Sequence, residues 1–149
     1  MHAEFFGLTI QAWYTSIVLP AWAPPVWMFG LAWGIIYPLM TVSFAYVFYK
    51  SLIKHEWRRY VGALFALNLV FNLIYSVGTF AAFNDNQTLN DVRALYWPAA
   101  IVISVVLLTL PAMIIATWDR SKWVALAQLP YLAWVSVATL LQFSINFAN

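Results

Sequence analysis

The residues that most often do chemistry in proteins are few in this chain, and they lie outside its long apolar runs. The only histidines are His2 and His55, and there is no cysteine. The five acidic residues stand at the ends of apolar runs or between them: Glu4, Glu56, Asp85, Asp91 and Asp119. No two of these groups have a metal-ligand spacing, and no phosphate loop or nucleophile motif is present. The sequence therefore predicts a protein that is not an enzyme, with no catalytic or metal-binding residue.

Aromatic side chains at helical spacing are stronger candidates, and the chemistry that suits them is binding. Trp33 and Tyr37 stand four residues apart, so they share one face of a helix. The same spacing recurs near the C-terminus at Tyr131, Trp134, Ala138 and Leu141. Aromatic walls with small residues between them suit a flat apolar ligand. Ordinary helix packing accounts for the same spacing and is the commoner explanation.

Two amides within an apolar run form a second candidate site. Asn68 and Asn72 are also four residues apart, and Tyr75, Ser76 and Thr79 continue their polar side. An amide in hydrocarbon needs a hydrogen-bond partner, so this face should point into a helix bundle. Hydrogen bonding between helices is the simpler role, and lining a ligand cavity is the alternative.

Four apolar runs carry these residues, at 26–49, 60–83, 94–117 and 123–147. Each has roughly 23–25 residues, or about 35 Å of helix, against a hydrocarbon core of about 30 Å. Apolar residues make up 64% of the chain and charged residues 8%, against roughly 45–50% and 25% in a soluble domain. The predicted fold class is all-α, an integral membrane bundle with four transmembrane helices.

The basic residues predict how the bundle is oriented in the membrane. Six of the seven Lys and Arg residues fall within 50–59 and 120–122, which four spans place on one side. Basic loops are usually cytoplasmic, so both termini should lie outside. A bacterial inner membrane is the expected location and an organellar membrane the alternative. The spans hold no charged residue for an ion-coupled transporter, and no basic stripe suits a nucleic-acid partner.

Residues 1–25 form a separate N-terminal segment before the bundle of residues 26–149. The stretch from Phe5 to Leu19 is apolar but short for a span and ends at Pro20, so we expect an interfacial position. Pro24 and Pro25 predict an extended lead-in that fixes where the first span begins. Three further residues predict local effects, a kink at Pro130 and close helix contacts at Gly62 and Gly78.

The motif at residues 13–25, Trp-Tyr-Thr-Ser-Ile-Val-Leu-Pro-Ala-Trp-Ala-Pro-Pro, resembles the first-loop signature of the TspO/MBR family. That family contains the bacterial tryptophan-rich sensory proteins and the mitochondrial translocator protein. The match continues through Trp27, Phe29, Gly30, Trp33, Tyr37 and Met40, and resumes at Leu67, Asn68 and 129–134. Family members normally have five helices, and we expect the one before Trp13 to be missing here.

The resemblance implies an intramembrane pocket for a tetrapyrrole or another flat hydrophobic ligand, used in sensing, transport or scavenging. No cofactor is required, and a porphyrin or haem-like molecule is the expected ligand. Together with the aromatic faces, the resemblance gives these candidate ligand-contacting residues: Trp33, Tyr37, Asn68, Phe71, Trp97, Tyr131, Trp134, Ala138 and Leu141. Light-dependent porphyrin breakdown in some relatives is the one enzymatic alternative.

The expected absence of one helix suggests a second role. A bundle without it would expose a groove that a partner's helix could fill, so the chain could be a structural or accessory subunit of a membrane complex. The expected partners are therefore the lipid bilayer, an apolar small molecule, and either a second copy in a homodimer or other subunits of a complex.

Overall fold

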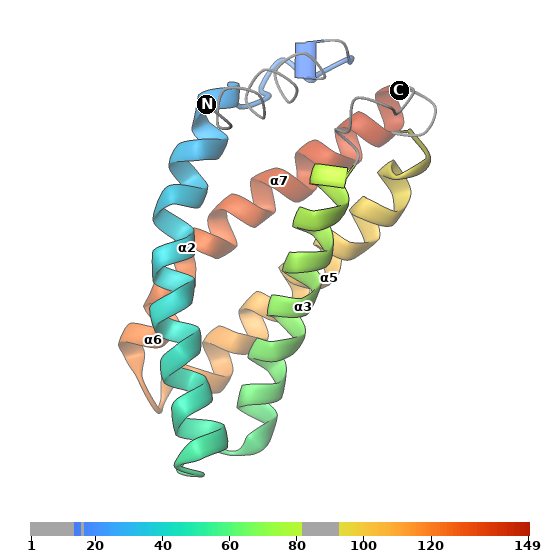
Figure 1. The fold of residues 1–149 in the computed structure, drawn as a ribbon. Helices are drawn as coiled ribbons and strands as arrows, with labels where there is room; N and C mark the ends of the chain where they lie inside the picture. Colours follow the sequence, from blue (N-terminus) through green and yellow to red (C-terminus); the bar gives the residue numbers. More distant parts are fainter. Residues whose placement is uncertain (1–13, 16, 82–92) are drawn as a thin grey trace, which may run out of the picture.

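The computed structural model describes residues 14–15, 17–81 and 93–149, which form an elongated bundle of helices (Figure 1). The helices are α2 (Val26–Phe48), η1 (Tyr49–Ile53), α3 (Arg59–Ala81), α5 (Tyr96–Trp118), α6 (Lys122–Ala127) and α7 (Leu129–Ala148). Four stretches are long and apolar enough to cross a membrane: Val26–Ile53, Arg59–Gly78, Tyr96–Trp118 and Lys122–Ala148. The predicted all-α fold with four membrane-spanning helices is confirmed.

The first span begins as predicted and ends later than predicted. Pro25 is extended, with φ −65° and ψ 151°, and its carbonyl accepts the first helical hydrogen bond, from the Met28 N–H at 3.0 Å. At the other end α2 continues into η1, a π-helical turn whose Lys54 N–H reaches back to the Tyr49 carbonyl. The span therefore extends to Ile53, four residues beyond the predicted end.

The fourth span is broken into α6 and α7 at Gln128, two residues before Pro130. Pro130 lacks an N–H and its ring would clash with the carbonyl of residue 126 in a continuous helix. The Gln128 N–H bonds instead to the Ala125 carbonyl at 3.2 Å. Helix α7 then begins at Leu129, and its first hydrogen bond runs from the Leu132 N–H to the Gln128 carbonyl. The kink predicted from Pro130 is thus present as a tight turn just before it.

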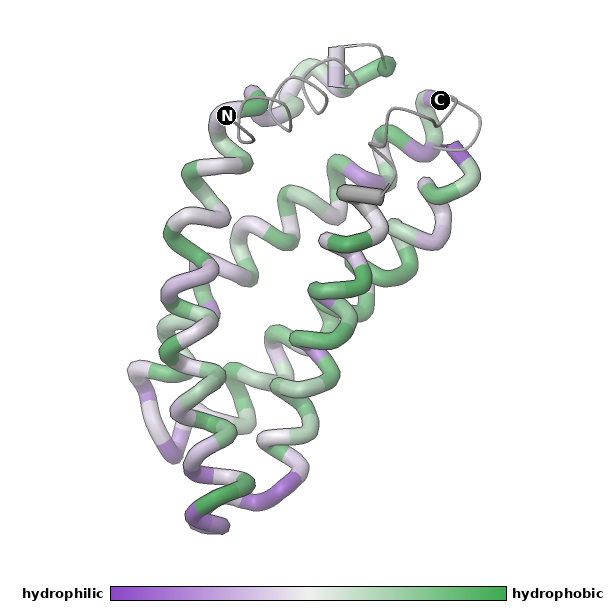
Figure 2. The backbone as a smooth tube through the Cα atoms, in the orientation of Figure 1, coloured by the Kyte–Doolittle hydropathy of each residue, from purple (hydrophilic) through white to green (hydrophobic). Residues whose placement is uncertain are grey.

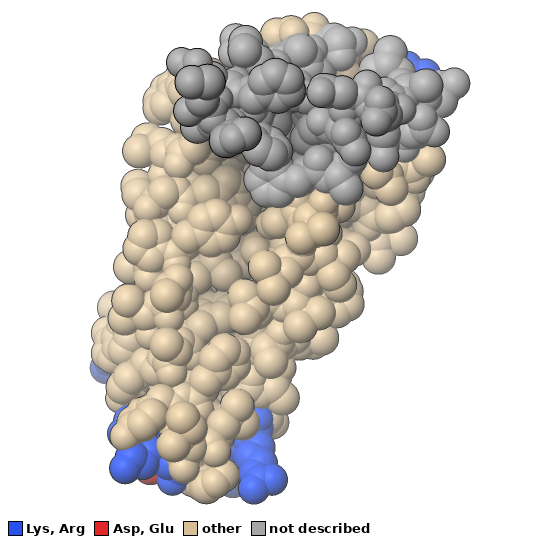
Figure 3. Space-filling view, in the orientation of Figure 1, with Lys and Arg blue, Asp and Glu red and all other residues tan. Residues whose placement is uncertain are grey.

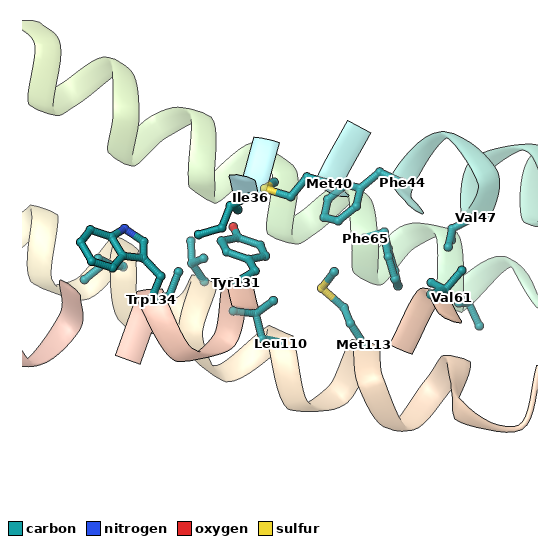
Figure 4. Close-up of a cluster of buried hydrophobic side chains, with 14 residues drawn as sticks. Ile36, Met40, Phe44, Val47, Val61, Phe65, Leu110, Met113, Tyr131 and Trp134 are labelled. Carbon is teal, nitrogen blue, oxygen red and sulfur yellow. The ribbon is translucent and has the colours of Figure 1, made fainter. Parts of the chain in front are cut away.

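Helix α5 is the centre of the bundle, because it packs against both α3 and α7. Helix α2 lies close to α3 at the η1 end and diverges from it toward the other end (Figure 1). The core between these helices is apolar, and Figure 4 shows its side chains interlocking, with Phe44 facing Phe65 at a ring-centroid distance of 4.8 Å. The fully buried members include Val47, Val61, Phe65, Leu110 and Met113.

The outer surface of the described residues is also apolar. Leu108, Ile115 and Phe147 are each about three-quarters exposed, at 74%, 75% and 77%. Figure 2 shows hydrophobic residues along the length of the helices, and the most hydrophilic stretches near the helix ends. Because lipid can face such side chains directly, this surface is that of an integral membrane protein.

The described part of the N-terminal segment lies across the end of the bundle where α7 ends (Figure 1). The Tyr14 hydroxyl donates to the Pro24 carbonyl at 2.8 Å, and burial raises the pKa of this hydroxyl. The Asn149 side chain accepts from the Val18 N–H at 3.0 Å and donates to the Val18 carbonyl at 3.1 Å. The interfacial position expected for the stretch from Phe5 to Leu19 stays a prediction, because residues 1–13 and 16 lie outside the described residues.

Of the two glycines expected to allow close helix contact, Gly62 does so within the chain. A Cβ at Gly62 would lie 3.0 Å from the Cβ of Ser51, so α3 approaches η1 closely only because Gly62 has no side chain. A Cβ at Gly78 would meet nothing within 4 Å. Gly62 therefore fixes the junction between the first two spans.

We expect Gly62→Val to destabilise the protein by about 1–3 kcal/mol, because the added side chain would push η1 away from α3. Gly78→Val is the matched control, since it makes the same change in the same helix where there is open space. The measurement is unfolding of both variants in detergent micelles by a denaturant titration. Equal losses in the two variants would contradict this explanation of Gly62.

Candidate ligand-binding site

The aromatic face predicted on the first span is present on α2. The rings of Trp33 and Tyr37 are stacked, with centroids 4.9 Å apart and an angle of 20° between planes. Trp33 also meets the ring of Tyr131 on α7 edge-on at 6.4 Å. Tyr37 is 43% exposed and Tyr131 is buried. The pair on α2 is thus a flat aromatic surface that is open on one side and backed by α7 on the other.

Trp134 lies one turn beyond Tyr131 on α7 and is nine-tenths buried. Its ring meets Phe29 of α2 edge-on at 5.2 Å, and Phe29 in turn meets Tyr14 at 5.7 Å. The indole N–H of Trp134 has no acceptor among the described residues. In Figure 4 this nitrogen is on the side of the ring that faces away from α7. A buried donor without a partner costs about 1–3 kcal/mol, so it needs an explanation.

Tyr131 is held by the two amides of α3. The Asn72 side chain donates to the Tyr131 hydroxyl at 2.8 Å, and that hydroxyl donates to the Asn68 side-chain oxygen at 3.1 Å. Asn68 in turn donates to the Thr109 hydroxyl at 2.7 Å and to the Val106 carbonyl at 3.2 Å on α5. The amide face therefore points into the bundle, as predicted, and links α3, α5 and α7.

This network bears on the two roles considered for Asn68. The residue is fully buried, and both its amide hydrogens and its oxygen are used within the chain. The geometry thus favours hydrogen bonding between helices over direct contact with a ligand. Asn68 still affects the ring contacts between α2 and α7, because it fixes the orientation of Tyr131. We call these rings the aromatic wall: Phe29, Trp33, Tyr37, Tyr131 and Trp134.

The remaining candidate residues fall into three places. Phe71 and Ala138 pack against the main core cluster, which includes Trp134 and against which Trp33 also packs. Leu141 belongs to a smaller cluster with Tyr14, Tyr96 and Ile145 at the end of the bundle. Trp97 lies apart from the others, because it is 49% exposed and its ring meets Phe143 and Phe147 at 6.3 and 5.4 Å.

Sequence reasoning missed three residues that support the site. Phe29 contacts Trp134, Thr109 anchors Asn68, and Gln128 donates to the Ser43 hydroxyl of α2 at 3.0 Å. Phe29 stands four residues before Trp33, so the helical spacing could have indicated it. Thr109 and Gln128 were isolated polar residues in apolar runs, which signals a buried bond without showing its partner.

The described residues thus form a polytopic helical membrane protein whose interior carries an aromatic wall and an unpaired indole N–H. No group of three His, Cys, Asp or Glu residues that could hold a metal occurs in this part of the chain. The chain belongs to the TspO/MBR family, whose family model matches residues 3–148.

Individual relatives support this assignment. The chain is 30% identical to the tryptophan-rich protein TspO of Archaeoglobus fulgidus, over 97% of this chain and 85% of the relative. It is 36% identical to the protein of the same name from Chlorobaculum tepidum, over 92% and 79%. The human translocator protein is 27% identical over 89% and 72%. None of these three names describes a catalysed reaction, and we do not assign the chain to an enzyme class.

We expect Asn68 and Tyr131 to be energetically coupled, since each satisfies the other's buried polar group. In a double-mutant cycle of Asn68→Ala and Tyr131→Phe, the coupling should be about 0.6 kcal/mol, the average for such bonds in membranes, and no more than about 1.7 kcal/mol. The cycle is measured by unfolding in mixed micelles. Strictly additive effects would show that the bond contributes nothing to stability.

Proposed function

We propose that the protein binds a tetrapyrrole or another flat hydrophobic ligand within the membrane, for sensing, transport or scavenging. The observation that carries this proposal is the buried indole N–H of Trp134, which has no acceptor among the described residues. An acceptor on a bound ligand would remove the cost of that unpaired donor. Membership of a family with a translocator protein among its relatives supports the same role.

The aromatic wall suits a ligand that is flat and apolar. The stacked pair of Trp33 and Tyr37 offers a π surface, and edge contacts from Tyr131 and Phe29 favour further aromatic partners. Access from the side is supported by the exposure of Tyr37 and by the hollow beside α2 in Figure 3. A porphyrin combines a flat ring with carboxylate groups, so it matches both the wall and the indole N–H.

The first test is a titration of the purified protein with protoporphyrin IX, followed by tryptophan fluorescence. We expect saturable binding with a Kd of about 1–10 μM, equivalent to roughly −7 to −8 kcal/mol. The double variant Trp33→Leu/Trp134→Leu should weaken binding at least about tenfold, because it removes the wall from both helices. Trp97→Leu, a tryptophan away from the wall, is the matched control and should bind normally. Unchanged affinity in a folded double variant would refute the proposed site.

A second test separates the contribution of the Trp134 N–H to affinity from that of the aromatic ring. Trp134→Phe keeps an aromatic ring and removes the N–H. We expect it to lower affinity for protoporphyrin IX about tenfold, the effect of one charge-assisted hydrogen bond. Affinity for the porphyrin dimethyl ester should fall less, because a neutral ester is a weaker acceptor than a carboxylate. Equal losses for acid and ester would show that the N–H does not contact the carboxylate.

A structural or accessory subunit is the second candidate, and the divergence of α2 from α3 favours it (Figure 1). A helix from a partner could pack against the side of α2 that α3 leaves uncovered. In that case the protein should co-purify with its partner in mild detergent and should bind porphyrin only in the complex. Porphyrin binding by a lone monomer or homodimer contradicts this candidate.

We propose a bacterial inner membrane as the location, with residues 50–59 and 120–122 on the cytoplasmic side. Relatives from archaea and bacteria support a prokaryotic membrane. The chain has no cysteine, so single cysteines can report sidedness directly. Ala148→Cys should react with a membrane-impermeant maleimide in intact cells, and Ser121→Cys only after permeabilisation. The reverse pattern would invert the proposed orientation.

A further inference from the structure

Two basic segments about sixty residues apart in sequence are brought together at one end of the bundle. Near the end of α2, the ring of Tyr46 meets Trp57 at 5.8 Å and Trp123 at 5.1 Å. Arg58 follows Trp57 directly, and Lys122 precedes Trp123. The contacts of Tyr46 therefore hold the two basic segments next to each other, and Figure 3 shows basic side chains gathered at this end.

Most of the positive charge at this end is uncompensated. Six basic residues lie in these two segments, beside two acids, Glu56 and Asp119. Glu56 is paired with Lys50, and Arg120 donates to the Ala116 carbonyl. The charged side-chain groups of four exposed residues form no ion pair or hydrogen bond among the described residues: Lys54, Arg58, Arg59 and Lys122. We call these four residues the basic rim.

The loop that carries most of the basic rim is ordered by its own backbone. The Lys50 carbonyl accepts from the N–H groups of Glu56 and Trp57, at 2.9 and 3.2 Å. The chain reverses at His55, which has a positive φ of 55°. The ammonium of Lys54 lies over the ring of Tyr49 at 5.7 Å. The backbone that carries Lys54 and Arg58 is thus already ordered beside the end of the span.

The surroundings of the basic rim indicate an amphiphilic partner. Leu52 and Ile53 are 51% and 69% exposed directly beside Lys54. Exposed rings of Tyr60, Trp118 and Trp123 lie at the same ends of the spans, as is typical of the headgroup level. A free anion would use the cations and leave these apolar side chains uncovered. A phospholipid would cover both, with its phosphate on the cations and its acyl chain on the apolar residues.

We propose that the basic rim binds the headgroups of anionic phospholipids in the adjoining leaflet, at a site separate from the aromatic wall. The partner is a lipid of the bilayer rather than a soluble phosphate. Bound anionic lipid would bridge the first loop and the start of α6, and so would stabilise the end of the bundle that Tyr46 and Gly62 hold together.

The test uses the purified full chain with equal amounts of phosphatidylglycerol and phosphatidylcholine of the same acyl chains. Lipid retention is measured by native mass spectrometry. We expect the wild type to prefer phosphatidylglycerol by at least about fivefold, the effect of one engaged cation, in about 50 mM salt. The preference should fall at about 500 mM salt, because these cations are exposed.

Variants show which residues are responsible for the preference for phosphatidylglycerol. Lys54→Gln/Arg58→Gln/Arg59→Gln should lose it, and Arg93→Gln should keep it, because Arg93 is an exposed cation that no basic-rim residue neighbours in sequence. If the triple variant does not fold, Lys122→Gln alone should lower the preference measurably. Equal retention of both lipids by the wild type overturns the proposal. Displacement of phosphatidylglycerol by an equal concentration of inorganic phosphate also overturns it, because the partner would then be the ion alone.

Discussion

The structure depends on one constraint, that a polar group in hydrocarbon must find its partner inside the protein. The Tyr131 hydroxyl meets this constraint by bonding to Asn68 and Asn72, and Asn68 extends the same chain to Thr109. These bonds join three spans and fix the side of α7 that faces α2. Three buried side-chain atoms among the described residues have no hydrogen-bond partner: the Ser51 hydroxyl, the Gln128 oxygen and the Trp134 indole N–H. Only the last of these belongs to the aromatic rings between α2 and α7.

Tyr131 and Trp134 lie on one helix but differ in how their polar atoms are satisfied. They are adjacent on the same face of α7, and both meet aromatic rings of α2. The polar atom of Tyr131 is satisfied by the chain, and that of Trp134 is not. The hydrogen-bonded tyrosine holds the helix in place, and under the proposed function the neighbouring tryptophan would offer its N–H to the ligand. The rings of the aromatic wall are packed against one another, and the indole N–H of Trp134 is the buried polar group among them without a hydrogen-bond partner in the described residues.

Much of the fold could be predicted from sequence, because run length and charge placement alone determine how many helices cross a bilayer. The start of the first span followed from Pro25. Its extension through η1 to Ile53 did not, because this stretch packs against α3 beside Gly62, and run length does not show contacts between spans. For the site, helical spacing correctly placed Trp33 beside Tyr37. Spacing could not show that Trp97 lies on the outer surface or that Asn68 is already saturated, since both depend on neighbouring helices.

The π-helical turn η1 has a consequence for length variation along this chain. Each of its hydrogen bonds encloses one residue more than an α-helical bond, so the turn holds an extra residue with little change in where the helix ends. Val47 before it and Val61 after it are both fully buried. A relative one residue shorter at this point could replace the turn by regular α-helix and keep both valines in the core. The geometry of the turn would therefore allow the first loop to change in length by one residue while Val47 and Val61 keep their packing.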